Sequence, residues 1–334
     1  MTRFLHLAAL FLATAGIAAF DASAAPAQRT FVSGAFGVDS NPCSVTMPCR
    51  QFSVALANTQ PGGEIVVLDS AGYGTVLINQ AVTIVAPPGV YAGISVISPS
   101  LAGITINVGA ADKVTLRGLT ITGISGTLFA GIQFNSGAAL YVENVAVSGF
   151  NTGGSGIVAG ASNALLVVSD SSLRDNTSGL VTGNSVTALT LSVERTTFER
   201  NGTGANIRGN TTGEIRGSRV TDGSNGVFAG QAGFAATLHV NDCTISNNTA
   251  SGVAATVSGT SGTAISVVSS QISGNGTGIA ATNSGNTVYA SDTTITRNTT
   301  GLAAASPATI VSGGDNRLTD NGANGSFSST VPKN

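Results

Sequence analysis

The sequence lacks tryptophan, and aromatic residues make up only 5% and charged residues only 9% of its 334 positions. The scarcity of aromatic rings excludes a binding face built by stacking sugars on aromatic platforms. The net charge of −2 gives no electrostatic reason to expect nucleic acid or an anionic membrane as a partner. Hydrophobic residues are nevertheless 42% of the chain, and 44 residues are glycine. This composition favours short strands and many turns over helices.

The first 24 residues are typical of a secretory signal peptide. Arg3 precedes an apolar run, and Ala22-Ser23-Ala24 provides a cleavage site of the A-x-A kind. We therefore expect a mature chain that is secreted, periplasmic or on the cell surface, without a membrane span. The alternative is an N-terminal membrane anchor.

Three cysteines are present. Cys43 and Cys49 lie close together in NPCSVTMPC, and in an exported chain this spacing predicts a local disulfide. Metal binding is the alternative, but two thiolates without a nearby histidine make a poor zinc site. We predict neither a metal nor a cofactor. Cys243 takes a repeat position held elsewhere by Ser or Thr, which indicates a small buried residue and not a nucleophile.

An internal repeat of 22–27 residues runs through the chain. A large apolar residue marks each repeat shortly before a turn, and the markers are Ile121, Val147, Leu173, Phe198, Val220, Ile245, Ile272, Ile295 and Leu318. A period of this length indicates a solenoid. Apolar columns before the marker and a glycine after it divide each repeat into three short strands. Stacking these coils predicts an all-β parallel β-helix with three short parallel sheets and about eleven or twelve coils.

One asparagine recurs in the turn after the marker. Amides stacked in this way can bond to the coil above and the coil below, which predicts an asparagine ladder. Gly223 interrupts the column once. The members of the predicted ladder are Asn176, Asn201, Asn248, Asn275, Asn298 and Asn321.

The N-terminal part resembles a known superfamily. CRQFSVALANTQPGGEIVVLDSAGYGTVLINQAVTI looks like the opening of pectin-lyase-like right-handed β-helix proteins, and RTFVSGAFGVDSNPCSVTMPCRQF is similar to uncharacterised secreted bacterial members. The resemblance implies a right-handed helix that begins with a short capping helix, whose apolar face would be Phe52, Ala55 and Leu56. The expected divisions are a signal peptide at 1–24, a cap at 25–60, the β-helix at 61–322 and a polar tail at 323–334.

The superfamily includes pectate lyases, polygalacturonases, epimerases and phage tailspikes, so the fold does not select a function. The G-H-G and R-I-K elements of polygalacturonases and the W-I-D-H and R-x-P-x-x-R segments of pectate lyases are missing from the sequence. No catalytic residue is therefore assigned. We expect non-enzymatic recognition of a polysaccharide, a cell-surface glycan or another surface partner through a rigid solenoid face. The alternatives are a polysaccharide lyase, hydrolase or epimerase with diverged catalytic residues, and a structural stalk or adhesin module.

Charged residues concentrate between positions 170 and 222. In the aligned repeats Asp170 precedes Arg195 and Asp175 precedes Arg200, so stacked charges have opposite signs and favour surface ladders. The alternative is a groove in which arginines bind the carboxylates of an acidic or polyhydroxylated sugar. The candidates for that role are Arg208, Arg216 and Arg219.

Overall fold

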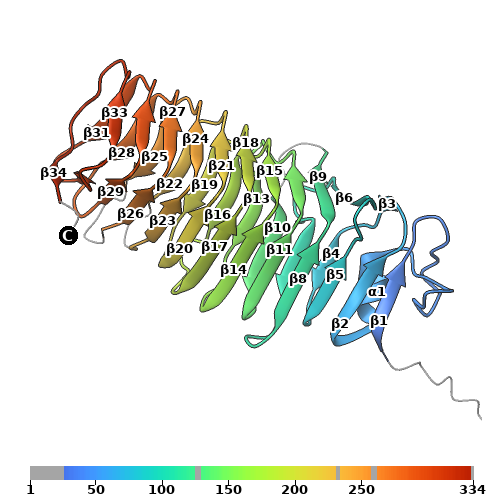
Figure 1. The fold of residues 1–334 in the computed structure, drawn as a ribbon. Coiled ribbons are helices and arrows are strands. Elements are labelled where there is room, and N and C mark those ends of the chain that lie inside the picture. The colour runs from blue at the N-terminus through green and yellow to red at the C-terminus, as the bar shows by residue number, and fades with distance from the viewer. Residues whose placement is uncertain (1–25, 125–128, 231–233, 257–261, 332–334) are drawn as a thin grey trace, which may run out of the picture.

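The computed structural model describes residues 26–124, 129–230, 234–256 and 262–331, and the predicted signal peptide lies outside this part of the chain. The described residues form an elongated solenoid in which each coil stacks on the one before (Figure 1). Each strand pairs in parallel with the equivalent strand of the next coil, so like residues lie one above another. The predicted all-β parallel solenoid with three sheets is confirmed.

Among the described residues, sheet A is the largest of the three sheets, with 13 strands. Its strands are β1 (Ala27–Val32), β2 (Thr59–Val67), β5 (Val82–Val85), β8 (Lys113–Arg117), β11 (Ala139–Glu143), β14 (Ala164–Ser169), β17 (Leu189–Glu194), β20 (Thr211–Arg216), β23 (Thr237–Asn241), β26 (Ala264–Val268), β29 (Thr287–Ser291), β32 (Thr309–Ser312) and β34 (Ser329–Thr330).

In the described part of the chain, sheet B has 11 strands and sheet C has 10. The strands of sheet B are β3 (Ala71–Gly72), β6 (Ala92–Val96), β9 (Leu119–Gly123), β12 (Ala146–Ser148), β15 (Ser172–Arg174), β18 (Thr197–Glu199), β21 (Arg219–Thr221), β24 (Thr244–Ser246), β27 (Gln271–Ser273), β30 (Thr294–Thr296) and β33 (Arg317–Thr319). The strands of sheet C are β4 (Val76–Ile78), β7 (Ile104–Asn107), β10 (Ala130–Ser136), β13 (Ser155–Ala159), β16 (Ser178–Thr182), β19 (Thr203–Ile207), β22 (Asn225–Ala229), β25 (Ser251–Ala255), β28 (Thr277–Ala281) and β31 (Thr300–Ala304).

The number of coils is slightly lower than the sequence predicts. A complete coil needs a strand in every sheet, and sheet C has only ten strands among the described residues. The expectation of eleven or twelve coils was therefore too high. The extra strands of sheets A and B belong to partial coils at the two ends, which the repeat alone does not separate from complete ones.

The interior is filled by the apolar columns seen in the sequence. The marker residues Val147, Leu173 and Phe198 are fully buried and pair in register on β12, β15 and β18. Because side chains alternate across a strand, the residues on either side of each marker face outward. The stacked markers therefore form one side of a continuous core.

The N-terminal end is closed by more than a helix. Helix α1 (Phe52–Ala57) buries Phe52, Ala55 and Leu56, the apolar face that the resemblance implied. The outer edge of β1, however, is covered by the loop that the Cys43–Cys49 disulfide closes: the Phe31 amide donates to the Cys43 carbonyl at 2.8 Å, and the Cys49 amide donates to the Phe31 carbonyl at 3.0 Å. The sequence predicted a cap with a local disulfide and a short helix but assigned the covering of the first coil to the helix, whereas the loop also satisfies the hydrogen bonds of the exposed edge strand.

Asp69 fastens this cap to the first coil. Its carboxylate accepts hydrogen bonds from the Ser33 hydroxyl and the Tyr73 hydroxyl, both at 2.6 Å, and from the amide of Ala35 at 3.0 Å. Burial by itself would raise the pKa of Asp69, but these hydrogen bonds and one from the Gly34 amide hold the pKa well below its usual range. The cap therefore depends on an ionised carboxylate.

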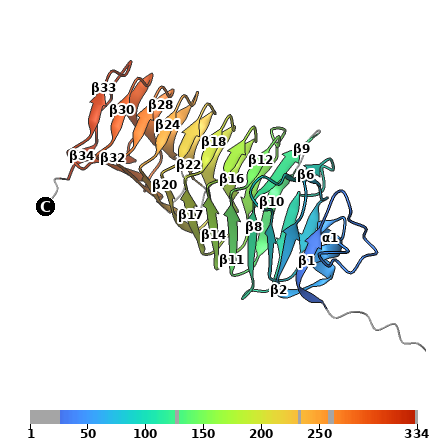
Figure 2. The same ribbon diagram turned by 45° about the vertical axis from the view of Figure 1, so that its right-hand side comes forward.

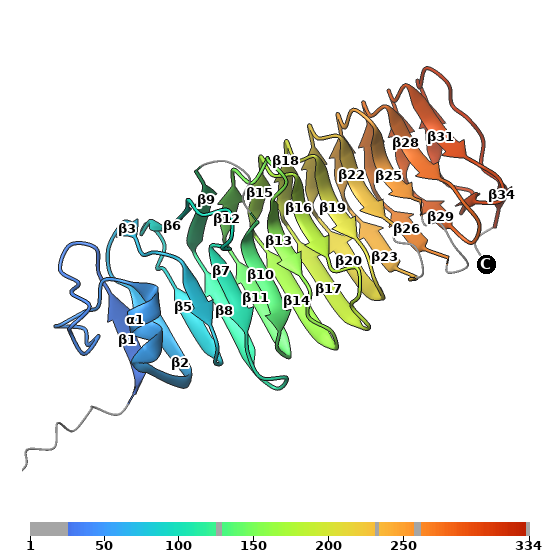
Figure 3. The same cartoon turned by 180° about the vertical axis from the view of Figure 1, so that it is seen from behind.

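The C-terminal end is closed by a partial coil that lies within segment 323–334, where the sequence predicts a polar tail. The Gly301 and Leu302 amides donate to the Ala323 and Asn324 carbonyls at 2.7 and 2.9 Å, and β34 pairs with β32. Phe327 packs against the core. Helix α1 and strand β34 thus lie at opposite ends of the solenoid (Figures 2 and 3). Nowhere in the described ranges is a helix long and apolar enough to cross a membrane.

Candidate functional site

Sheet B is bordered by two sharp corners, one toward sheet A and one toward sheet C. At each corner one residue per coil adopts the left-handed conformation, with φ values of 45° to 59° at Arg195, Asp242, Asp292 and Asp222. These residues end or follow a strand and carry their side chains outside the core. Stacked coils turn them into two outward columns that run along the solenoid, and we call these the A–B corner column and the B–C corner column.

Hollows form where a corner column contains a small residue between larger ones. Gly217 lies between Arg195 and Asp242 in the A–B column, beside a hollow of about 350 Å³. Ser269 lies between Asp242 and Asp292 in the same column, beside a hollow of about 470 Å³. In the B–C column, Gly274 borders a hollow of about 410 Å³. The first two hollows share Asp242, and the last two share Gln271.

Because they share these residues, the three hollows lie side by side on the outer surface of sheet B and reach from one corner to the other. We call this row of hollows the sheet-B groove and define it by Arg216, Asp242, Thr244, Ser269, Gln271, Asp292, Thr294 and Arg297.

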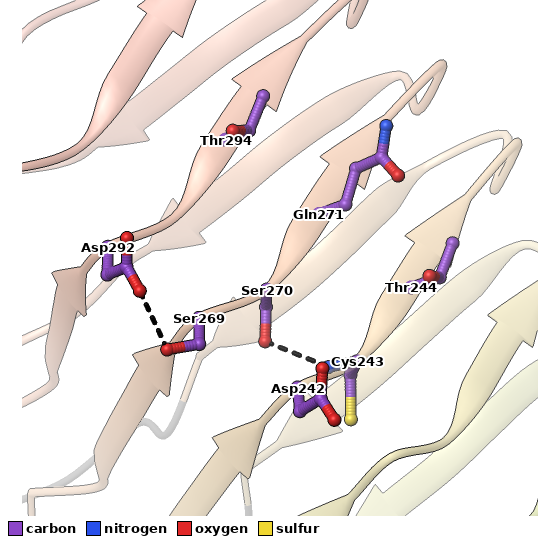
Figure 4. Close-up of a pocket in the computed structure, with 8 residues that line it drawn as sticks. All are labelled: Asp242, Cys243, Thr244, Ser269, Ser270, Gln271, Asp292 and Thr294. Carbon is purple, nitrogen blue, oxygen red and sulfur yellow. Dashed lines mark hydrogen bonds between the residues drawn. The ribbon is translucent and has the colours of Figure 1, made fainter.

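The central hollow shows how the strands present these groups (Figure 4). Thr244, Gln271 and Thr294 are register partners on β24, β27 and β30. At the corner, the Ser269 hydroxyl donates to Asp292 Oδ2 at 2.9 Å, which orients that carboxylate over the hollow. Carboxylate, hydroxyl and amide groups therefore face one solvent-filled space from three successive coils.

Cys243 contributes to the wall of this hollow but not to its chemistry. Its side chain is only 3% exposed, and its amide donates to the Ser270 hydroxyl at 3.1 Å. Burial raises the pKa of the Cys243 thiol to about 11, so the thiol stays protonated at neutral pH. The structure thus agrees with the interpretation of Cys243 as a small buried residue.

Most groove side chains have no partner among the residues that the structure describes. Asp242, Gln271 and Arg297 are exposed, and within the part of the chain that the structure describes their side chains make no hydrogen bond or ion pair. In the same described ranges, no group of three or more His, Cys, Asp or Glu residues is placed to hold a metal ion. The groove therefore offers separate polar groups on a rigid backbone.

The neighbouring coils toward the N-terminus use the same corners differently. Arg195 donates two hydrogen bonds to Asp170, at 2.7 and 2.9 Å, and Arg200 donates two to Asp175, at 2.8 and 3.0 Å. The bonds from Arg195 lower the pKa of Asp170. These are two of the opposite-charge pairs that the aligned repeats predicted. Because the partners bind each other, these side chains are less available to a ligand.

The three arginine candidates do not form one cluster. Arg216 ends β20 and lines the hollow beside Gly217, and Arg219 on β21 is the register partner of Thr244. Arg208 lies at the opposite end of β20, where its guanidinium donates to Asn206 Oδ1 and Asn184 Oδ1 at 3.2 and 3.3 Å. The structure therefore places Arg216 and Arg219 next to the groove and Arg208 away from it.

The sequence analysis did not single out Asp242, Gln271, Asp292 or Arg297. A signal for them was present in the alignment of the repeats. Gly217, Ser269 and Gly274 are small residues that stand between larger polar ones in their columns, and each borders a hollow. Gly118 and Gly149 occupy the same columns nearer the N-terminus, so a small residue is a hint of a hollow only where larger polar residues flank it.

The recurrent asparagines lie in the turn beneath the B–C corner. Asn248 Nδ2 donates to Asn275 Oδ1 at 2.9 Å, and the same amide-to-amide contact joins Asn275 to Asn298 and Asn298 to Asn321, both at 3.0 Å. Asn176 and Asn201 make the contact at 3.1 Å on the other side of Gly223. These buried bonds connect successive coils directly below the groove.

Comparison with known proteins was made against this geometry. A model of the right handed beta helix region matches residues 102–300. The chain belongs to this right-handed β-helix family. The sequence of this chain matches no curated protein.

Two solved structures share the fold of this right-handed β-helix protein. Pectate lyase Pel9A is 15% identical with a TM-score of 0.55, over 93% of this chain and 80% of that one. XylC, solved in complex with xylose, is 8% identical with a TM-score of 0.55, over 91% of this chain and 72% of that one. At these identities the likeness shows the fold alone, and it confirms the resemblance to pectin-lyase-like β-helices.

Proposed function

We propose that this right-handed β-helix protein recognises a glycan in the sheet-B groove without changing it chemically. The observation that carries the proposal is the set of exposed, unpartnered polar side chains, Asp242, Gln271 and Arg297 among them, on consecutive coils. Sugar hydroxyls both donate and accept hydrogen bonds, and carboxylates, amides and guanidinium groups are suited to meet them in pairs.

The spacing of these groups favours a linear polymer. Thr244, Gln271 and Thr294 stand on adjacent strands, which lie about 4.8 Å apart. A polysaccharide that crosses sheet B obliquely through the three hollows would meet polar side chains from several successive coils. Since the backbone is held by parallel sheets, little conformational entropy would be lost on binding.

The charges within the groove indicate which glycans fit. Asp242 and Asp292 stand at the central hollow, and Arg216 and Arg297 stand at its two ends. Neutral hydroxyl-rich units would occupy the centre, and acidic units would be held at the ends by arginine. The sugar-related names of the two similar structures, a pectate lyase and a protein bound to xylose, support this ligand class.

A glycoside hydrolase is the second candidate. Asp242 and Asp292 face the same hollow from positions two strands apart, which places their backbones about 9–10 Å from each other. Inverting glycosidases hold their two carboxyl groups about 6.5–9.5 Å apart. Both aspartates are exposed, however, whereas a general acid working near neutral pH needs a protected environment. Binding therefore fits the groove better than hydrolysis.

A glycan array with the mature chain tests the proposal, followed by titration calorimetry on the best ligand. We expect Asp242→Asn to weaken binding about tenfold, or about 1.4 kcal/mol, while the matched control Asp175→Asn leaves it unchanged because Asp175 is already paired with Arg200. Equal effects of the two variants on glycan affinity would show that the glycan does not bind in the sheet-B groove.

Assays for reducing ends and for unsaturated products decide between binding and catalysis. Product formation that disappears in Asp242→Asn would replace the proposal with an enzymatic function. Silence of the array and of both assays would contradict glycan recognition and leave the stalk or adhesin interpretation.

We further propose that the protein acts outside the cytoplasm. The Cys43–Cys49 disulfide supports this location, since such bonds persist in oxidising compartments. Mass spectrometry of the protein from culture medium, periplasm and cell surface tests it. A mature N-terminus at Ala25 is expected, and retention of residues 1–24 would contradict cleavage.

A further inference from the structure

A small slot with mostly apolar walls opens on the outer face of sheet A, where β32 and β34 lie near the C-terminal end of the solenoid (Figure 2). Its volume is about 210 Å³. We call it the Tyr289 slot and define it by Ser266, Tyr289, Ala290, Ser291, Val311, Ser312, Gly313 and Val331. None of these residues is charged.

The slot presents an aromatic ring that the core does not use. Tyr289 on β29 stands between its register partners Ser266 on β26 and Val311 on β32, and Val331 follows β34. Tyr289 is 49% exposed and Val331 is 59% exposed, whereas Val311 is only 9% exposed. A half-exposed ring and an exposed valine therefore border a covered apolar floor.

The size of the slot suits a single six-membered ring. A cavity of about 150 Å³ takes up one benzene molecule, whereas pockets for drug-sized ligands begin at about 300 Å³. The volume of the Tyr289 slot lies between these two values. Because no lining residue is charged, an ionic group would lose its hydration there without gaining a partner.

Hydroxyl groups accompany the apolar walls. Within the part of the chain that the structure describes, the hydroxyls of Ser266 and Tyr289 make no hydrogen bond. The Ser291 hydroxyl donates to the Asp315 carboxylate, so its oxygen can still accept. A pyranose ring combines an apolar face of C–H groups with an edge of hydroxyls. It can therefore lie against Tyr289 while its hydroxyls pair with the serines.

The slot adjoins the sheet-B groove across the A–B corner. Ser291 lines the slot, and the next residue, Asp292, lines the central hollow of the groove. The Asp315 carboxylate accepts from the Ser291 hydroxyl at 3.1 Å and from the Asp292 amide at 2.8 Å, which fixes the two residues relative to each other. One glycan can consequently reach both places around a single rigid corner.

We infer that the Tyr289 slot is a second glycan subsite, which holds one neutral sugar unit stacked on the tyrosine ring. The inference rests on the proposed glycan recognition and extends it from sheet B to sheet A. The scarcity of aromatic residues excludes an extended stacking face, but a single unit needs only one ring. The unit that fits is a neutral side branch or chain end of a glycan whose main chain occupies the groove.

Fluorine NMR of the mature chain labelled with 3-fluorotyrosine tests the slot, since the protein has only four tyrosines and Tyr289→Phe assigns the relevant resonance. Neutral methyl glycosides of six-membered sugars, added up to about 100 mM, should shift the Tyr289 resonance saturably. The resonance of Tyr91, which is 50% exposed, should not move. A methyl glucuronide should bind at least about fivefold more weakly, because its carboxylate finds no cation in the slot.

Two variants attack the slot in different ways. Tyr289→Ala removes the stacking surface and should weaken binding of the methyl glycosides about fivefold by saturation-transfer NMR, whereas the matched control Tyr91→Ala should leave it unchanged. Ser266→Ile fills the slot from β26 with a residue that strands favour, and it should abolish the shift of the Tyr289 resonance. Circular dichroism verifies that each variant is folded.

Absence of a shift at Tyr289 with every neutral methyl glycoside, equal shifts at Tyr91, or a folded Ser266→Ile variant that binds like wild type would overturn the inference. A glycan selected on the array separates the slot from the groove. Affinity that falls in Asp242→Asn but not in Tyr289→Ala would contradict the slot alone. Affinity that falls in Tyr289→Ala but not in Asp242→Asn would support the slot and contradict the groove.

Discussion

Two stretches of the A–B corner column differ in whether their carboxylates are paired with arginine. Along coils β14 to β18, Arg195 reaches back one coil and donates to both carboxylate oxygens of Asp170, from Nε and Nη2. Along coils β23 to β29, the residue equivalent to Arg195 beside Asp242 is Ser269, whose hydroxyl donates to Asp292 on the other side and leaves Asp242 unpaired among the described residues. One residue in an outward column thus decides whether a carboxylate is satisfied or left for a ligand.

The comparison shows how a repeat protein can acquire a site without an insertion. The backbone is the same in both stretches, since Arg195 and Ser269 have φ values of 45° and 48°. Only the size and sign of the side chain one coil away differ. A solenoid can therefore change from a closed surface to an open groove by a few substitutions on its outer columns, at little cost to the core.

The largest effect is expected below the groove, where both stretches share the asparagine column. Asn248→Ala removes a buried amide that donates to Asn275 Oδ1 and accepts from the Gly223 amide. Leaving these groups unpaired should lower the free energy of unfolding by about 2–3 kcal/mol. The exposed neighbour Thr249→Ala should change it by less than about 0.5 kcal/mol. Denaturant unfolding measures both, and equal stabilities would show that the column is dispensable.

The next effect comes from converting the open stretch into the paired one. Ser269→Arg should place a guanidinium beside Asp242 as Arg195 stands beside Asp170, filling the central hollow. Glycan affinity, measured by calorimetry, should fall at least about tenfold while the thermal midpoint barely moves. Thr190→Arg on the outer face of sheet A is the control. Full affinity in Ser269→Arg would show that the groove is not the site.

Lowering the pH should destabilise the cap and the charge pairs of the corner to different extents. The folded-state pKa of Asp69 lies well below the unfolded value of about 3.9, so its contribution to stability is complete above that pH and is lost as the pH falls toward the folded value. Hydrogen exchange should therefore rise in the cap loop near Ser33 as the pH falls below about 3.9, whereas exchange at the paired corner should barely change because its partners are exposed. In Asp69→Asn the loop should exchange quickly even at pH 7. Opening of the paired corner together with the cap loop would contradict this difference.

The smallest effect concerns the pairs themselves. Arg195→Asn, which suits the left-handed corner, removes the hydrogen bonds that lower the pKa of Asp170. The pKa of Asp170 should return toward about 3.9, measured by side-chain NMR, with no measurable change in thermal stability because both partners are exposed. A large loss of stability would show that the paired corner supports the fold.

Much of the architecture could be predicted from the repeat. The marker column, the Ser and Thr column that contains Cys243, and the pairs Asp170 with Arg195 and Asp175 with Arg200 all follow from aligning the coils. They could be predicted because stacking places residue n directly on its equivalent in the next coil. The closure of β1 by the Cys43–Cys49 loop could not, since it depends on one non-repeating segment folding back onto an edge.

The sequence by itself determined the solenoid, because a column of like side chains packs only when every coil has the same period and the same three strands. It did not determine which polar groups are free. That depended on the exact register at the corners, where Gly217, Ser269 and Gly274 leave space between coils that neighbouring arginines fill elsewhere. The physical reason is that the repeat imposes the same packing on every coil, whereas a groove depends on side chains that differ between three or four adjacent coils.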